Sequence, residues 1–173
     1  MGYQLIETIE VGSGGASSIE FTGIPQTGVN LVVTSSARGS GVSTSWKINF
    51  NSDTSANYSY RLLTGTGSSV SSVAGNYPSL DSKIETTVLT TSSATADTFS
   101  SIQAYVSNYT STASKSVSTD GTQENNATAS RIAIGAGSYL GTSPITSIQI
   151  TSFSASYLFV EHSTFSLYMI TAD

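Results

Sequence analysis

The one histidine of the chain, His162, is the residue type best suited to general acid or base catalysis, and it lies next to Glu161. A catalytic base needs a second group to orient it. Adjacent residues of an extended strand point to opposite faces, so Glu161 does not fill this role. The chain has 35 serines, so a serine near His162 is expected by chance. We therefore expect a surface or strand-end histidine and no enzymatic activity.

A second candidate site is the segment 51–57, in which oxygen-bearing side chains occupy alternate positions: Asn51, Asp53, Ser55 and Asn57. This spacing is typical of the first half of a calcium-binding loop. The second half departs from the pattern, because Ala56 stands where the sharp turn needs glycine and Leu62 where a bidentate glutamate belongs. The sequence favours side chains that cap turns through their own backbone, with a metal site as the open alternative. No cofactor is expected.

Cysteine content and charge exclude several classes of function. The chain has no cysteine, which excludes disulfides and thiolate sites. Its net charge is −5 and its six Lys and Arg residues are spread along the sequence. These features argue against nucleic-acid binding, because affinity for phosphates comes from clustered cations. No window approaches the roughly 18 consecutive apolar residues of a membrane-spanning helix, so no membrane partner is expected.

The aromatic residues have two open interpretations, since tyrosine offers a rigid amphipathic ring. They can stack on sugars or line a subunit contact, and core filling explains most of them equally well. The residues concerned are Trp46, Tyr58, Tyr60, Tyr77, Tyr105, Tyr109 and Tyr139.

The apolar residues recur with a period of two in short runs, which indicates strands. Because no long helical pattern appears, parallel crossovers are disfavoured and the sheets should be mostly antiparallel. We expect a single domain over residues 1–173, an all-β, antiparallel two-sheet sandwich of jelly-roll type. The residues expected to point inward are Ile19, Phe21, Leu31, Val33, Trp46, Ile48, Phe50, Ile132, Ile134, Ile148, Ile150, Phe165 and Leu167.

The segment from Thr64 to Ala96 has a weaker pattern and is rich in Ser, Thr and Gly. We expect a long loop excursion from the core, ordered by a short strand over Ile84 to Thr90 and a helical turn near Tyr77 to Asp81. Further along the chain, the dipeptide Asp120-Gly121 predicts a tight turn.

Three segments of the chain together resemble a group of phage virion proteins known from phages of cyanobacteria and other marine bacteria. These segments are Tyr3 to Ile9 with Gly14 to Thr27 and Leu31 to Val33; Ile48 to Asp53 with Asn57 to Ser59; and Pro144 to Ile150 with Val160 to Tyr168. Family members typically show a Tyr-Gly-Ile ending, where this chain has Tyr168-Met-Ile170. The resemblance leaves Thr64 to Ala96 unaccounted for.

The resemblance implies a non-enzymatic virion structural protein. Within that group we expect a capsid decoration, or cement, protein that binds the major capsid protein on the head exterior after synthesis in the host cytoplasm. A tail-fibre or tail-tip module that recognises receptor glycans is the alternative. We expect a homotrimer, since closed cyclic symmetry is usual for homo-oligomers.

The excursion and the N-terminal strand are the expected makers of partner contacts. The residues assigned to this interface are Arg61, Val70, Val73, Tyr77, Leu80, Lys83, Glu85 and Val88.

Overall fold

Every regular element of the protein is a β-strand in the residues that the computed structural model describes, 2–42, 45–75, 79–86, 88–124 and 130–172. No helix in these ranges could therefore cross a membrane. The strands are β1 (Gly2–Glu10), β2 (Ser18–Phe21), β3 (Asn30–Ala37), β4 (Trp46–Phe50), β5 (Tyr58–Gly65), β6 (Val70–Ala74), β7 (Ile84–Thr86), β8 (Ser100–Val106), β9 (Lys115–Gln123), β10 (Arg131–Tyr139), β11 (Ile148–Ser152) and β12 (Thr164–Thr171).

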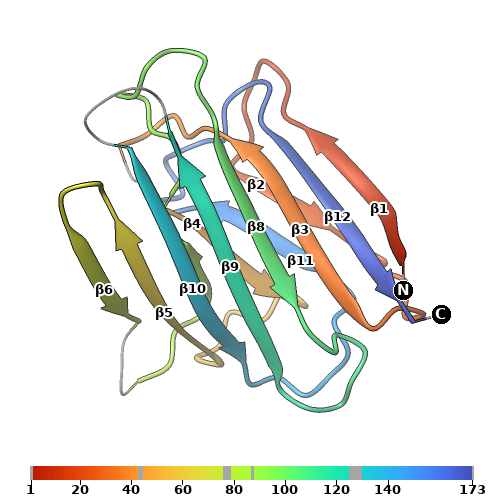
Figure 1. Ribbon diagram of the computed structural model, residues 1–173. Helices are drawn as coiled ribbons and strands as arrows, with labels where there is room; N and C mark the ends of the chain where they lie inside the picture. The colour runs from red at the N-terminus through yellow and green to blue at the C-terminus, as the bar shows by residue number, and fades with distance from the viewer. Residues whose placement is uncertain (1, 43–44, 76–78, 87, 125–129, 173) are drawn as a thin grey trace.

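The strands form two antiparallel sheets packed face to face (Figure 1), so the expected all-β sandwich is confirmed. The larger sheet has eight strands in the order β1-β12-β3-β8-β9-β10-β5-β6, and the smaller has four in the order β2-β11-β4-β7. Along the chain, β1 to β4 alternate between the two sheets, and so do β7, β8, β11 and β12. This alternation gives two facing four-stranded layers, the arrangement of a jelly roll.

Two hairpins extend the larger sheet beyond this jelly roll. The β9–β10 hairpin adds to the β8 edge, and the β5–β6 hairpin then adds to β10. The smaller sheet is therefore opposed to only part of the larger one, and β6 forms a free edge whose five residues are all exposed.

The inward positions of both sheets form one core. Eleven of the thirteen residues expected to point inward are at most 3% exposed. Ile132 and Ile134 are the exceptions, at 56% and 54% exposure, so their assignment to the core was wrong. Strand β10 does alternate, but its inward residues are Ala133, Gly135 and Gly137, and the isoleucines point to the outer face. A period of two cannot by itself tell which face is buried.

The excursion is closer to the core than expected. Residues 70–74 pair with β5, and Ile84, Val88 and Leu89 are buried at 1% exposure or less. No helical turn occurs at residues 79–81, and residues 76–78 lie outside the described ranges. Asp120 and Gly121 form no turn either, because they continue β9.

Each of these three buried side chains packs directly against a glycine. A Cβ added at Gly121 would lie 2.4 Å from Val88 Cγ2, one at Gly137 2.9 Å from Ile84 Cδ1, and one at Gly39 2.9 Å from Leu89 Cδ2. Gly121 lies in β9 and Gly137 in β10, so the larger sheet has bare backbone where Val88 and Ile84 pack against it. The position of Gly121 within a strand therefore reflects a close approach and not a turn.

A matched pair of substitutions tests the assignment of faces. Ile148→Ala should lower the free energy of unfolding by about 2–5 kcal/mol, because it leaves a cavity in the core. Ile134→Ala removes the same atoms from an exposed side chain and should cost less than about 1 kcal/mol. Urea unfolding followed by circular dichroism measures both values. Equal losses would contradict the outward orientation of Ile134.

Candidate functional site

His162 lies on the surface, just before β12. Its Nδ1 is 3.6 Å from Glu10 Oε1, and both side chains are largely exposed. The neighbouring Ser163 is fully buried, and its hydroxyl accepts a hydrogen bond of 3.1 Å from the backbone N–H of Arg38. The serine next to His162 thus holds β3 to the start of β12, and the imidazole forms an exposed pair with a carboxylate.

In the loop from Asn51 to Asn57, side-chain oxygens accept hydrogen bonds from other groups of the protein. Asp53 accepts hydrogen bonds of 2.8 Å from the backbone N–H of Ser55 and from Asn57 Nδ2, and one of 3.2 Å from the Tyr139 hydroxyl. These donors, Asn57 first, hold the pKa of Asp53 below its ordinary value. The expected turn-capping role of Asp53 is confirmed. Among the described residues, no group of three His, Cys, Asp or Glu side chains could hold a metal.

The residues expected to make partner contacts separate into several places. Val70 and Val73 are exposed on β6, at 72% and 46%. Arg61 and Leu80 line a hollow of about 570 Å³ beside the β5–β10 pair. Val88 belongs to the core and cannot touch a partner, so that assignment was wrong; it points into the sandwich against Gly121. Tyr77 lies outside the described residues.

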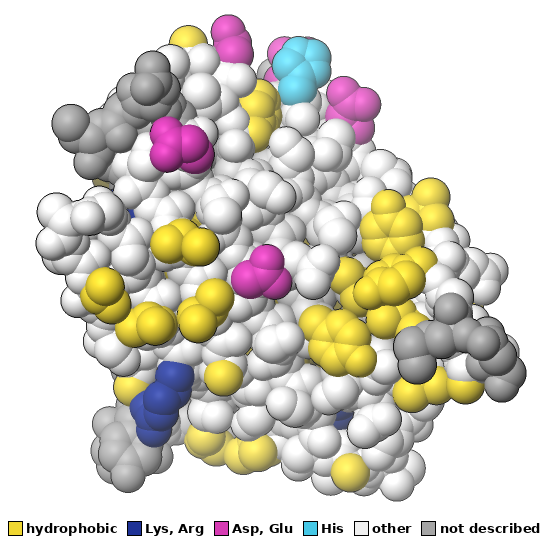
Figure 2. Space-filling model, in the orientation of Figure 1, with side chains coloured by type: hydrophobic (Ala, Val, Ile, Leu, Met, Phe, Trp, Pro, Cys, Tyr) yellow, Lys and Arg dark blue, Asp and Glu magenta, His cyan; other side chains and the backbone are white. Residues whose placement is uncertain are grey.

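The outer face of the eight-stranded sheet carries two apolar patches (Figure 2). The aliphatic patch covers β5, β6 and β10, and its residues are Leu63, Val70, Ile132 and Ile134. The aromatic patch covers β1, β12, β3 and β8, and its residues are Tyr3, Leu5, Val32, Tyr105, Tyr168 and Ile170.

The aromatic patch is packed within itself. The rings of Tyr3 and Tyr168 meet edge to face with centroids 6.4 Å apart. Val32 and Ile170 point to this outer face and yet are only 1% and 3% exposed. Neither of them belongs to the core between the sheets. The two patches thus present ordered apolar surface, and they are separated by a polar band that includes Gln103 and Asp120.

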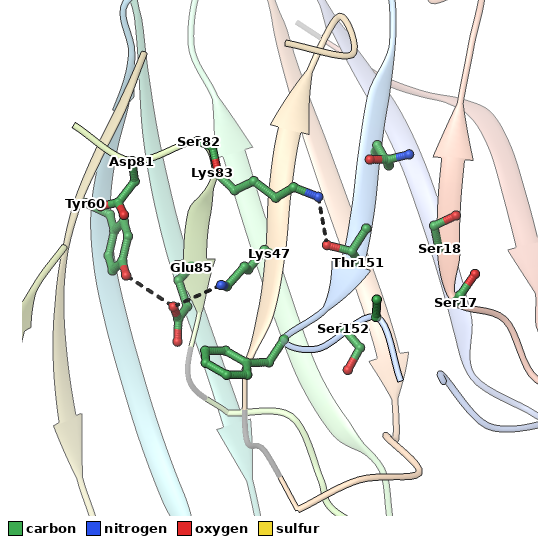
Figure 3. A pocket seen from close by; sticks show the side chains of 13 residues that line it. Ser17, Ser18, Lys47, Tyr60, Asp81, Ser82, Lys83, Glu85, Thr151 and Ser152 are labelled. Atoms are coloured by element: carbon green, nitrogen blue, oxygen red, sulfur yellow. Dashed lines mark hydrogen bonds and ion pairs between the residues drawn. The ribbon is translucent and has the colours of Figure 1, made fainter. Parts of the chain in front are cut away.

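The outer face of the four-stranded sheet is different, because it carries a polar concavity of about 390 Å³ (Figure 3). We call it the small-sheet concavity. The alternation that sends the isoleucines of β2, β4, β7 and β11 inward sends polar residues outward into it. Its lining residues are Ser17, Ser18, Lys47, Tyr60, Asp81, Ser82, Lys83, Glu85, Gln149, Thr151, Ser152, Phe153 and Ala155.

A short chain of contacts fixes one side of the small-sheet concavity. The Tyr60 hydroxyl donates to Glu85 Oε2 at 3.2 Å, and the same oxygen lies 4.0 Å from Lys47 Nζ. Lys47 Nζ also lies 4.3 Å from the centroid of the Phe153 ring. Burial, and then the charge of Glu85, raises the pKa of Tyr60, so this hydroxyl stays a donor. The contact with Lys47 holds the Phe153 ring on this side of the concavity.

Lys83, which also lines the concavity, makes fewer contacts than Lys47. Its Nζ donates to Thr151 Oγ1 at 3.2 Å, and no carboxylate of the described residues forms an ion pair with it. Desolvation, and then the charge of Lys47, lowers the pKa of Lys83. Lys83 and Glu85, which the sequence assigns to an interface, both lie in this concavity. Phe153 and Tyr168 are not among the residues expected from the sequence, although the alternation that directs Phe165 and Leu167 inward also directs Tyr168 outward.

Comparison of the chain with protein-family models and with curated proteins finds no match.

The internal role of Asp53 predicts a pH dependence. Because the folded state lowers its pKa, the ionised carboxylate contributes stability above the unfolded pKa, near 3.8, and this stability is lost as the pH falls through the folded-state value. Asp53→Asn cannot ionise, so it should be less stable at neutral pH and show a shallower loss of stability in acid. Urea unfolding at several pH values measures both effects. The matched control is Asp120→Asn, at an exposed position of β9; an equally shallow profile in that variant would contradict the role of Asp53.

Proposed function

We propose that this protein is a structural component of a phage virion and decorates the capsid exterior. The resemblance of three of its segments to phage virion proteins supports the assignment to a phage particle. The observation that carries the proposed mode of attachment is the pair of apolar patches on one broad sheet face. Contiguous exposed apolar surface marks interaction sites, and a stable protein contact needs about 800 Å² from each partner. An eight-stranded sheet face is wide enough to supply such an area.

The chemistry of this face suits a protein shell better than a charged partner. The aliphatic and aromatic patches supply the apolar anchors, and the hydroxyls and carboxamides between them supply the polar contacts that protein interfaces contain. The proposed partner is the major capsid protein of the same phage. In this arrangement the larger sheet faces the shell, and the smaller sheet faces the solvent.

A paired substitution tests the attachment face. Leu63→Asp with Ile134→Asp places two carboxylates in the aliphatic patch and should abolish binding to purified capsid shells, because each charge would be buried without a partner. Co-sedimentation with shells measures the binding. Val42→Asp, at a loop residue that is 71% exposed, is the matched control and should bind normally. Undiminished binding by the paired variant would exclude the aliphatic patch as the contact.

The small-sheet concavity favours a second candidate, a tail-fibre or tail-tip module that binds receptor glycans. The two candidates differ in abundance on the particle. A decoration protein should be released with capsid shells in many copies per virion. A receptor-binding module should be found with isolated tails in few copies. Gel densitometry of fractionated virions therefore decides between them.

We further propose a homotrimer in which β6 contacts a neighbouring copy. Strand β6 is an edge of the larger sheet, and its sequence, VSSVA, contains no charge and no proline. Such an edge presents unpaired backbone groups to another chain. The opposite edge strand, β1, has a bulge between Leu5 and Glu7. It also carries two acidic residues, Glu7 and Glu10. These features discourage pairing at β1, so in a cyclic trimer, whose contacts are heterologous, β6 of one copy would meet a different surface of the next copy.

A charge on β6 should disrupt this assembly. Val73→Lys is expected to convert the trimer into a monomer, because edge charges oppose strand pairing. Light scattering coupled to size exclusion measures the mass. Val42→Lys provides the control for an added surface lysine and should remain trimeric. A monomeric intact protein would refute the trimer, and a trimeric Val73→Lys variant would refute the role of β6.

A further inference from the structure

We propose that the small-sheet concavity binds an acidic saccharide, with the sugar carboxylate at Lys83 and the sugar ring against Phe153. This inference does not rest on attachment to a capsid, since the concavity and the apolar patches lie on opposite faces of the sandwich. A head protein or a tail protein could each use the site.

The charges in the concavity point to an anion. Of the two carboxylates that line it, Glu85 is engaged by Tyr60 and Lys47, and Asp81 also has partners. Lys83 is half-buried, and its one hydrogen bond to the described residues goes to a neutral hydroxyl, that of Thr151. A partly desolvated ammonium is stabilised by an opposite charge. A ligand carboxylate at Lys83 Nζ would provide that charge and reverse the lowering of the Lys83 pKa.

The aromatic ring and the neutral groups point to a sugar. Phe153 is 48% exposed, although Lys47 lies over its ring. A sugar ring has apolar C–H faces that pack on aromatic rings and hydroxyls that need both donors and acceptors. The side chains of Ser17, Ser18 and Gln149 are of that kind, and they make no hydrogen bond to the described residues. Figure 3 shows the two serines on the side of the concavity away from Tyr60 and Asp81.

A buried amide beneath this surface adds a second, independent observation. Asn49 is fully buried, yet neither its Nδ2 nor its Oδ1 has a hydrogen-bond partner among the described residues. Asn49 pairs with Gln149 of β11 on one side. On the other side Ile48 pairs with Ile84 of β7, so the same antiparallel register places Lys83 opposite Asn49. An unpaired buried amide is costly and rare in proteins. Its place between Gln149 and Lys83, two lining residues, puts an unsatisfied amide directly beneath the concavity.

Three soluble probes of matched size test the inference: trigalacturonate, neutral galactotriose and triglutamate. Trigalacturonate should bind and shift the backbone NMR resonances of β4, β7 and β11, and the other two probes should bind at least about tenfold more weakly. Loss of one charge-assisted hydrogen bond is sufficient for a change of that size.

Two pairs of variants assign the contacts. Lys83→Met should weaken trigalacturonate binding at least about tenfold, whereas Lys83→Arg should retain most of it because the charge remains. Phe153→Ala should weaken binding in the same way, and Phe153→Tyr should not. Val42→Ala is the control for an exposed apolar residue outside the site. The spectrum of each free variant reports whether it is folded.

Each alternative outcome overturns the inference. Equal binding of galactotriose would remove the role of the carboxylate, and equal binding of triglutamate would show that charge alone is recognised. Binding that is unaffected by Lys83→Met and Phe153→Ala would place the saccharide elsewhere. Absence of trigalacturonate binding by the folded intact protein would overturn the site, while leaving capsid attachment to be judged by the shell experiments.

Discussion

The close packing of Ile84, Val88 and Leu89 against bare backbone is the constraint on which the two faces of the sandwich depend. The larger sheet is twice as wide as the smaller one, so part of its inner face needs another cover. Ile84 of β7, the edge strand of the smaller sheet, and the buried Val88 and Leu89 extend this cover, and glycines at 39, 121 and 137 let the three side chains approach closely. Dense packing of this kind is specific, since even one added methylene must displace a neighbour.

This arrangement fixes which residues face outward. Small inward residues on β10 leave room for Ile84 beneath it, so the isoleucines of that strand project from the other face and join Leu63 in the aliphatic patch. Ile84 belongs to β7, which also carries Glu85 and begins directly after Lys83 at the small-sheet concavity. The packing of Ile84 against β10 therefore affects both the apolar face of the larger sheet and the small-sheet concavity.

The outer faces of the two sheets differ in chemistry, since one is largely apolar and the other is polar. The aliphatic and aromatic patches leave apolar surface in water, a cost that a protein partner would remove. The small-sheet concavity keeps charged and hydroxyl groups in a partly desolvated place, which favours a polar ligand. A sandwich keeps such surfaces apart, so one can hold a partner while the other stays open.

The sequence by itself determined the strand class, the sandwich and most of the core, since a period of two, as in Trp46, Ile48 and Phe50, follows from strand geometry alone. Alternation also predicts which residues share a face. Which face is buried depends on what packs against it, and for Ile132 and Ile134 only the tertiary structure decided this. It alone also placed Lys83 near Phe153, some 70 positions apart in the sequence, because sites of this kind are built by strands that meet through the fold.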